Sequence, residues 1–330
     1  MASSSEDLHL KLPFPDLPQD IGRIIFEIAA SLDLQTGAFC ALVSKQVKTW
    51  VEPVLYRYIR IKDRKSLEYL SRSIREPDST KSHAFFASHV KSLAFIGPGS
   101  GIGGDVDSLS ILKACRGVDS LYLWSNIWVR FREKSKFQRF FTSPSTTLSP
   151  RRVFIRHALS SPRDLSHFGH AIFRNLTHLE VDVRDKWKWE TLKQLDRLTH
   201  LAIEAEYGMR HSSASRMVAQ FPDSLKVVIY WVDRCLIEEI NGLTMEREVT
   251  FEQEVTGAMK LIQDGQTDQR AVLGTWLVNF DGDSEPQWNA DRILTWKMGK
   301  TSRGSNASRK DFWTLAEEIV AKRRLDLATV

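Results

Sequence analysis

The segment best suited to chemistry in this sequence of 330 residues is a run of glycines, Gly99 to Gly104, with the spacing GxGxxG after a predicted strand. In dinucleotide-binding proteins such glycines let a pyrophosphate approach the N-terminus of a helix. A carboxylate should then follow the next strand and hold the ribose, but the predicted strand 121–124 is followed by serine and asparagine. Asp105 and Asp107 would also repel phosphates. The run is therefore predicted to be a strand-to-helix loop, and we expect no cofactor.

Two histidines, His178 and His200, hold equivalent positions in two similar segments, NLTHLEV and RLTHLAI. Two histidines without a third ligand make a poor zinc site. We therefore expect them to stack as structural neighbours, and we predict no metal. No nucleophile motif places a Ser-His-Asp or Cys-His set. The sequence therefore predicts no catalytic residue and a protein that is not an enzyme.

Cations and aromatic residues alternate between Arg130 and Phe141. Such a pattern can bind phosphates and stack bases, and together with the basic loop 297–310 it supports one alternative function, nucleic-acid binding. The same pattern is typical of an amphipathic helix whose phenylalanines, Phe137, Phe140 and Phe141, face a core while the cations stay in water. We favour the helix and do not expect nucleic acid to be a partner.

The composition is that of an ordinary globular protein, with 42% hydrophobic and 26% charged residues and a net charge of +5. This charge permits contact with nucleic acid but does not argue for it. The three cysteines, Cys40, Cys115 and Cys235, lie far apart without a CxxC pair, which indicates reduced thiols in an intracellular protein, cytoplasmic or nuclear. The N-terminus lacks the apolar stretch of a signal peptide, and no apolar run is long enough to span a membrane.

The elements that must position a binding surface begin with the segment Leu17 to Ile61. Four isoleucines recur there with helical spacing: Ile21, Ile24, Ile25 and Ile28. A second helix is predicted from about Gly37 to Trp50. Pro53 should end this helix or begin the next turn, formed by residues 54–56, because proline cannot donate a hydrogen bond inside a helix. A strand at 58–61 follows. So short a helical unit has a small core of its own, so its apolar surface should pack against the rest of the chain or against a partner protein.

The order of residues in this segment resembles an F-box. The matching residues are Leu17-Pro18, Asp20, Ile25-Phe26, Val43-Ser44-Lys45 and Leu55-Tyr56-Arg57. The sequence departs from that pattern at Gly22, where leucine is usual, and at Val47, where tryptophan is common. The form ALVSKQVKTWVEPVLYR is similar to the F-box variant abundant in mushroom-forming fungi. The alternative is a helical cap that closes a larger fold.

The resemblance implies a substrate-recognition adaptor of a Skp–cullin–F-box type ubiquitin ligase. One partner would be the Skp-type linker protein of a cullin ubiquitin ligase, and the other an unidentified target protein bound by the surface of the repeats that follow. The residues that would contact the linker protein are Leu17, Pro18, Ile21, Ile25, Ile28, Val43 and Trp50.

A loose internal repeat follows a helix predicted from Arg64 to Arg75. Each unit holds a short alternating apolar pair, and the pairs are Leu93/Phe95, Leu121/Leu123, Val153/Ile155, Leu179/Val181, Leu201/Ile203 and Val227/Ile229. Stretches with helical spacing fill most gaps, so each strand should run parallel to the last and bury its core by stacking on its neighbours. The array resembles a degenerate leucine-rich-repeat solenoid, and a compact α/β domain is the alternative. Five tryptophans near strand ends are either recognition anchors or core residues: Trp124, Trp128, Trp187, Trp189 and Trp231.

Beyond residue 235 the pattern changes. A helix is predicted at 250–263, a strand at 271–280 and an amphipathic helix at 311–325, and we interpret this region as a cap over the last open repeat. The predicted organisation is a disordered lead at 1–12, an F-box-like helical module at 13–61, an irregular leucine-rich-repeat-like array at 62–235 and a C-terminal cap region at 236–330. The predicted fold class is α/β, with a small N-terminal helical F-box-like module, a solenoid of mostly parallel strands and a C-terminal capping helix.

Overall fold

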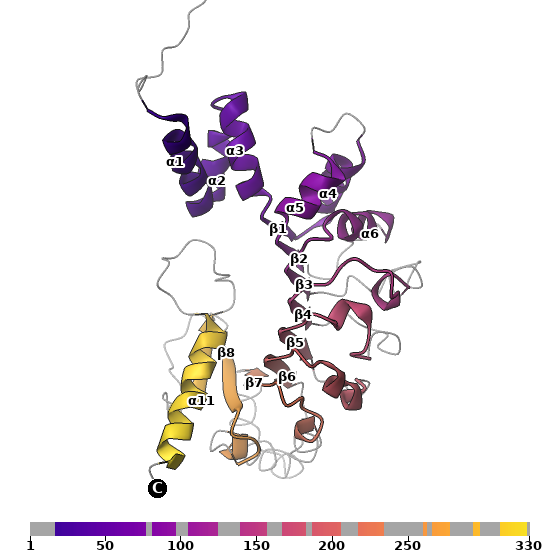
Figure 1. Cartoon of the computed structure of the whole chain (residues 1–330), viewed down its shortest axis with the longest axis vertical. Helices are drawn as coiled ribbons and strands as arrows, with labels where there is room; N and C mark the ends of the chain where they lie inside the picture. The colour runs from indigo at the N-terminus through magenta and orange to yellow at the C-terminus, as the bar shows by residue number, and fades with distance from the viewer. Residues whose placement is uncertain are drawn as a thin grey trace, which may run out of the picture. The chain divides into compact units, whose positions relative to one another are not determined.

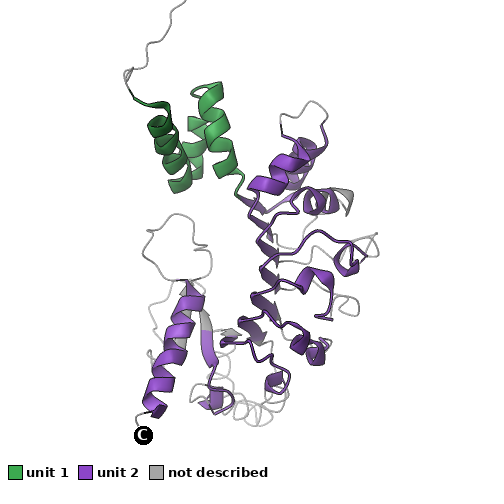
Figure 2. Cartoon of the chain, in the orientation of Figure 1, with its two compact units in different colours: residues 1–57 green, residues 58–330 purple. Residues whose placement is uncertain are grey.

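The computed structural model of this chain describes residues 17–76, 81–96, 105–124, 139–156, 167–182, 187–205, 217–233, 260–262, 266–277, 293–297 and 311–328. The chain divides into two compact units, 1–57 and 58–330 (Figure 2). The division falls just before the first strand of a sheet. The segment 58–61, predicted to end the helical module, therefore begins the second unit.

Three helices make up the described part of the first unit: α1 Gln19–Leu32, α2 Leu34–Cys40 and α3 Lys45–Leu55. Asp33 caps α2, because its carboxylate accepts a hydrogen bond from the backbone N–H of Thr36 at 2.7 Å. Ser44, in extended conformation, caps α3 by accepting from the N–H of Val47 at 3.1 Å. The prediction of one helix from Gly37 to Trp50 is therefore wrong, since the chain leaves helical conformation to form the second cap.

The core of this unit is small. Its buried residues are Ala30, Val47 and Val51, packed by partly buried Phe26, Cys40, Ala41, Trp50, Val54 and Leu55. Gly37 lets the helices approach closely, because a Cβ there would lie 2.7 Å from the Leu55 side chain and 3.0 Å from Ala30. Helix α3 runs through Pro53 to Leu55, so of the two predicted alternatives the one in which Pro53 ends the helix is wrong. A proline in the last turn removes only one backbone hydrogen bond, so the helix can continue.

In the residues that the structure describes, the second unit is built on one open sheet of nine parallel strands that follow one another in sequence order (Figure 1). The strands are β1 Tyr58–Ile61, β2 Ser92–Ile96, β3 Ser120–Trp124, β4 Arg152–Arg156, β5 His178–Asp182, β6 His200–Ala205, β7 Val227–Asp233, β8 Ala271–Leu277 and β9 Ile293–Lys297. The predicted α/β class and parallel, solenoid-like strand order are confirmed. The sheet continues past the predicted end of the array at 235, and β9 was not predicted.

Helices join the strands on one side of the sheet (Figure 1). They are α4 Arg64–Arg75, α5 His83–His89, α6 Asp105–Ala114, and the 3₁₀ helices η2 Ala171–Phe173 and η3 Trp189–Gln194. Helix α4 has the predicted bounds and buries Leu67, Leu70 and Ile74 as expected. The connections before β5 and β6 contain the two 3₁₀ helices, and the second spans a short step: Thr177 and Thr199, in equivalent places, are 22 residues apart. Residues 139–142, 217–218 and 260–262, in three other connections, are α-helical.

The apolar pairs of the repeat point into one core on this helix side of the sheet. Leu121, Leu123, Leu179, Val181, Leu201 and Ile203 are all buried, as predicted. The last predicted pair is wrong, because Leu201 pairs in register with Val228 and not with Val227. Strand β7 is buried on both faces from Val227 to Trp231, so it lacks the alternation that identifies the inward face.

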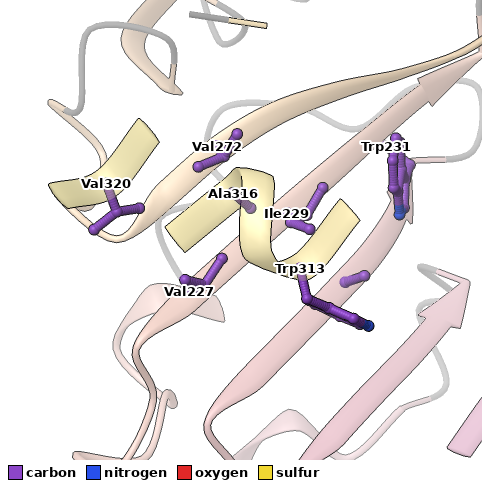
Figure 3. Packing of buried hydrophobic residues seen from close by; sticks show 8 residues of the cluster. Val227, Ile229, Trp231, Val272, Trp313, Ala316 and Val320 are labelled. Carbon is purple, nitrogen blue, oxygen red and sulfur yellow. The ribbon is translucent and has the colours of Figure 1, made fainter. Parts of the chain in front are cut away.

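The opposite face of the sheet is covered at β7 and β8 by helix α11, Phe312–Ala328. Figure 3 shows Trp313, Ala316 and Val320 of α11 over side chains of β7 and β8. The full cluster is Ala202, Val227, Ile229, Trp231, Val272, Trp313, Ala316 and Val320. The helix thus packs on a face of the sheet and contacts its last three strands, β7, β8 and β9.

Other predictions for the C-terminal region fall partly outside the described residues. Residues 260–262 are helical and 271–277 form β8, which agrees with the predicted helix and strand as far as they are described. The predicted loops 281–289 and 299–309 lie outside the described residues.

Candidate binding surfaces

The first unit carries large apolar side chains on its surface. The exposed ones are Leu17, Ile21, Ile24, Ile25, Ile28, Leu32, Leu34, Phe39, Leu42 and Val43. The isoleucines of α1 are between 44% and 53% exposed, and Leu42 is 80% exposed. Exposed apolar side chains in such number on one small unit mark an interaction surface.

Helix α1 has two apolar faces. With 3.6 residues per turn, Ile21, Ile25 and Ile28 fall on one side, while Phe26 and Ala30 fall on roughly the opposite side. Phe26 and Ala30 pack in the core, where the Phe26 ring lies 6.3 Å from the ring of Trp50. The isoleucine face is therefore not used by the core of its own unit.

The surface beside these isoleucines carries little charge. Between Ile28 and Ser44 the only acidic or basic residue is Asp33. The backbone hydrogen bond from Thr36 lowers the pKa of Asp33, which serves as the cap of α2. A partner could cover this stretch without desolvating any charge but Asp33, as in the core of many protein interfaces.

Six of the seven residues predicted to contact a linker protein are exposed: Leu17, Pro18, Ile21, Ile25, Ile28 and Val43. The seventh, Trp50, is partly buried against the core of its own unit. Sequence reasoning missed Leu32, Leu34, Phe39 and Leu42 as surface residues. The continuation of the helical spacing from Ile28 to Leu32 could have identified the first of them, whereas Leu42 lies in a turn that has no such periodicity.

In the second unit, two histidines lie beneath the first turn of α11. The rings of His178 and His200 are stacked, with centroids 4.2 Å apart and an interplanar angle of 1°. The ring of Trp313 meets both edge-on, at 5.3 and 5.4 Å. His200 Nε2 lies 3.1 Å from Oε1 of Glu317. The predicted stacking of the two histidines is thus confirmed, and α11 is what covers them.

Threonine hydroxyls hold both rings in place. The Thr199 hydroxyl donates a hydrogen bond to the carbonyl of Thr177 at 3.0 Å, and its Oγ1 lies 2.8 Å from Nδ1 of His200. The same carbonyl accepts the backbone N–H groups of Thr199 and His200. Thr177 and His178 repeat this arrangement at 2.8 Å.

Burial keeps these rings neutral. It lowers the pKa of His178 to about 3, helped by the neighbouring His200 and by Arg152. Burial also lowers the pKa of His200, while Glu317 acts in the opposite direction. Among the described residues no group of three potential ligands could hold a metal ion. The contacts of His178 and His200 with Trp313 and Glu317 therefore attach α11 to the sheet.

The other residues singled out from the sequence are buried, partly buried or undescribed, and Phe140 and Trp189 are among the partly buried ones. Phe141 is buried, as predicted, and Trp187 is buried with its ring stacked 4.9 Å from that of Phe168. Trp231 is buried under α11. The glycine run, residues 130–138, Trp128 and the loop 298–310 lie outside the described residues. Burial raises the pKa of Cys115 to about 12, which makes this thiol unreactive.

The α11 side of the sheet is exposed at its other end. Tyr58 of β1 and Tyr122 of β3 are 45% and 36% exposed. The Tyr122 ring lies 5.8 Å from that of Phe154 on β4, and Arg152 on the same strand is exposed. We call these four residues the aromatic–arginine surface.

Compared with known proteins, the chain matches no protein-family model and no curated protein. None of the helices in the described part of the chain is long and apolar enough to cross a membrane.

Proposed function

We propose that this protein is a substrate-recognition adaptor of a Skp–cullin–F-box type ubiquitin ligase. The helices of the first unit would bind the Skp-type linker protein, and the sheet of the second unit would bind a target protein. The observation that carries the proposal is the exposed apolar surface of the first unit, formed by Leu17, Ile21, Ile24, Ile25, Ile28, Leu32, Leu34, Phe39, Leu42 and Val43.

This surface supports a protein partner on energetic grounds. Burying one large aliphatic side chain that was exposed stabilises an association by about 1.5–3 kcal/mol. Helical apolar faces of this kind bind grooves in partner proteins through residues spaced three and four apart. Ile21, Ile24, Ile25 and Ile28 have that spacing and are exposed together. The F-box-like order of residues around them points to the linker protein as that partner.

The proposed role divides the work between the two units. The linker-binding residues lie on α1 and in the turn that precedes α3, whereas the parallel sheet has a large surface of its own. Such a role needs no catalytic group from this chain, because the ligase assembly supplies the chemistry.

A binding measurement with a purified Skp-type linker protein tests the proposal. We expect the full chain to bind, and the substitution Ile25→Asp to abolish binding because it places an unpaired carboxylate in an apolar contact. Gln46→Asp is the matched control: residue 46 is exposed in the first turn of α3, outside the apolar surface, where an acidic residue is tolerated.

Two outcomes would contradict the adaptor role. One is the absence of binding by the wild-type chain. The other is a loss of helical circular dichroism in Ile25→Asp, because this would mean that Ile25 supports the fold instead of a partner. Val51→Asp, at a fully buried position, shows what such unfolding looks like.

A further inference from the structure

We propose that the aromatic–arginine surface, Tyr58, Tyr122, Arg152 and Phe154, binds an acidic peptide segment that also carries an aromatic residue. The proposal rests on the adaptor role, for which it names the target-binding surface and the chemistry of the target. The surface lies on the α11 side of β1, β3 and β4, whereas α11 packs against β7 and β8.

The residue types on this surface are those that dominate protein interfaces. Tyrosine and arginine are enriched among residues whose loss costs the most binding energy. Tyr122 and Phe154 are in register on neighbouring strands with their rings in contact, so they present one continuous aromatic area. Tyr58 adds a second exposed ring two strands away.

The charge of the surface selects the sign of its ligand. Among the described side chains on this face of β1 to β4, the charged ones are Arg60 and Arg152, and both are cationic. The next strand supplies Glu180, which is buried. An incoming segment with carboxylates can therefore pair with Arg152, which is exposed, without meeting an exposed acidic side chain on these four strands.

Helix α11 shows what the same face accommodates within the chain. It brings an aromatic ring, Trp313, against the edges of two stacked rings, and a carboxylate, Glu317, to a nitrogen of His200. An aromatic group and a carboxylate on one segment are thus the combination that this face already binds at β5 and β6. We infer that a target segment uses the same combination at β1 to β4.

A peptide fits this surface better than a nucleic acid does. Single-stranded nucleic acids are held by several phosphate contacts at once, and the described part of this surface offers two arginines. Glu180 is in register with Phe154, and burial, Glu180 and Asp311 all raise the pKa of Tyr122. These acids disfavour a backbone with a charge at every nucleotide more than a peptide whose few carboxylates reach Arg152.

Selection from a random-peptide phage library against the full chain tests the proposal. We expect enrichment of peptides that combine aspartate or glutamate with an aromatic residue. Synthetic copies should bind the double variant Tyr122→Ala, Arg152→Glu about tenfold or more weakly than wild type. The control is Tyr69→Ala, Arg72→Glu, which changes an exposed tyrosine and an arginine on α4, on the helix side of the sheet, and should leave binding unchanged.

Several outcomes would overturn the proposal: no enrichment, enrichment of peptides without acidic residues, or equal binding to the double variant. Arg152→Glu alone changes an exposed position. If its circular dichroism matches wild type, its loss of peptide binding does not come from misfolding. If labelled oligouridine competes with the peptide and its binding requires Tyr122, the ligand of this surface is a nucleic acid and not a peptide.

The same variants separate this proposal from the adaptor role. Ile25→Asp should lose the linker protein and keep the selected peptide, and Arg152→Glu should do the reverse. A chain that binds the peptide through Tyr122 but no linker protein would keep the peptide site and refute the adaptor role. A chain that binds the linker protein but selects no peptide would keep the adaptor role and refute the site.

Discussion

Helices α1 and α11 both carry large apolar side chains, yet these side chains lie in opposite environments. The isoleucines of α1 are about half exposed, whereas Trp313, Ala316 and Val320 of α11 are buried against the sheet. An apolar stripe on a helix shows that the helix needs something to pack against. An apolar stripe alone therefore does not show whether the surface that packs against it belongs to the same chain or to a partner.

The difference lies in what the rest of each unit supplies. Strand β7 is apolar on both faces, so Val227 and Ile229 are left over after the helix-side core is complete, and α11 covers them. The core of the first unit takes Phe26 and Ala30 from the other side of α1. Within the described part of the first unit, residues 17–57, the isoleucine face is not covered by an apolar surface.

The strongest test of this comparison places the same charge on both helices. Ala316→Asp puts a carboxylate at a fully buried position, and we expect it to lower the free energy of unfolding by about 3–5 kcal/mol. Ile25→Asp, at a position 51% exposed, should change the free energy of unfolding by less than about 0.5 kcal/mol. Urea denaturation followed by tryptophan fluorescence and circular dichroism measures both. Similar losses in the two variants would show that the α1 face is also part of a core.

The second test concerns the repeat core. Leu201→Ala removes a fully buried side chain between β5 and β7, and we expect a loss of about 2–5 kcal/mol in the free energy of unfolding. Ile24→Ala, on the exposed face of α1, is the matched control and should cost far less. A Leu201→Ala variant as stable as wild type would mean that the stacked strands do not share one core.

The fold was largely predictable because its signals are local and repeated. Alternating pairs such as Leu121/Leu123 and Leu179/Val181 fixed the inward face of most strands, and the two Thr-His segments fixed the register of β5 and β6. The prediction failed at β7, where Val227 to Trp231 are all apolar, and left two alternatives at Pro53, where position within the last turn decides whether the helix continues.

The binding surfaces were less predictable. The order of residues identified Ile21, Ile25 and Val43 as surface residues, but no sequence pattern places Trp50 partly inside the small core. The aromatic–arginine surface could not be predicted, because Tyr58, Tyr122 and Phe154 lie far apart in the sequence and meet only through the register of parallel strands. The position of α11 on the face of the sheet depends on the same three-dimensional arrangement.

A smaller effect should follow from pH, and it involves only the second unit. The pKa of His178 is lowered to about 3 in the folded protein from 6.5 when unfolded. Below pH 6.5 the unfolded chain therefore binds a proton that the folded chain does not, so stability is complete above this pH and falls as pH decreases. The slope for this one residue is about 1.4 kcal/mol per pH unit. Unfolding of wild type and His178→Gln from about pH 7 to 5 measures it.

The control for the pH experiment is His83→Gln, which changes an exposed histidine on α5. This variant should keep the wild-type slope, because it leaves the stacked rings of His178 and His200 unchanged. A His178→Gln variant with the same slope as wild type would contradict the neutral, buried state of the ring pair.

The smallest expected effect is on the polar contact between His200 of the sheet and Glu317 of α11. The Glu317 side chain is 45% exposed, so water competes for the contact, and Glu317→Gln should lower the free energy of unfolding by about 1 kcal/mol or less. Because Glu317 favours the charged form of His200, the same substitution should lower the pKa of His200, which NMR titration of the ring protons measures. A loss of several kcal/mol would mean that this contact, and not the apolar packing of Trp313, Ala316 and Val320, holds α11 on the sheet. The different environments of α11 and α1 would then be explained by a hydrogen bond. Apolar side chains alone would not be enough to hold a helix on the sheet.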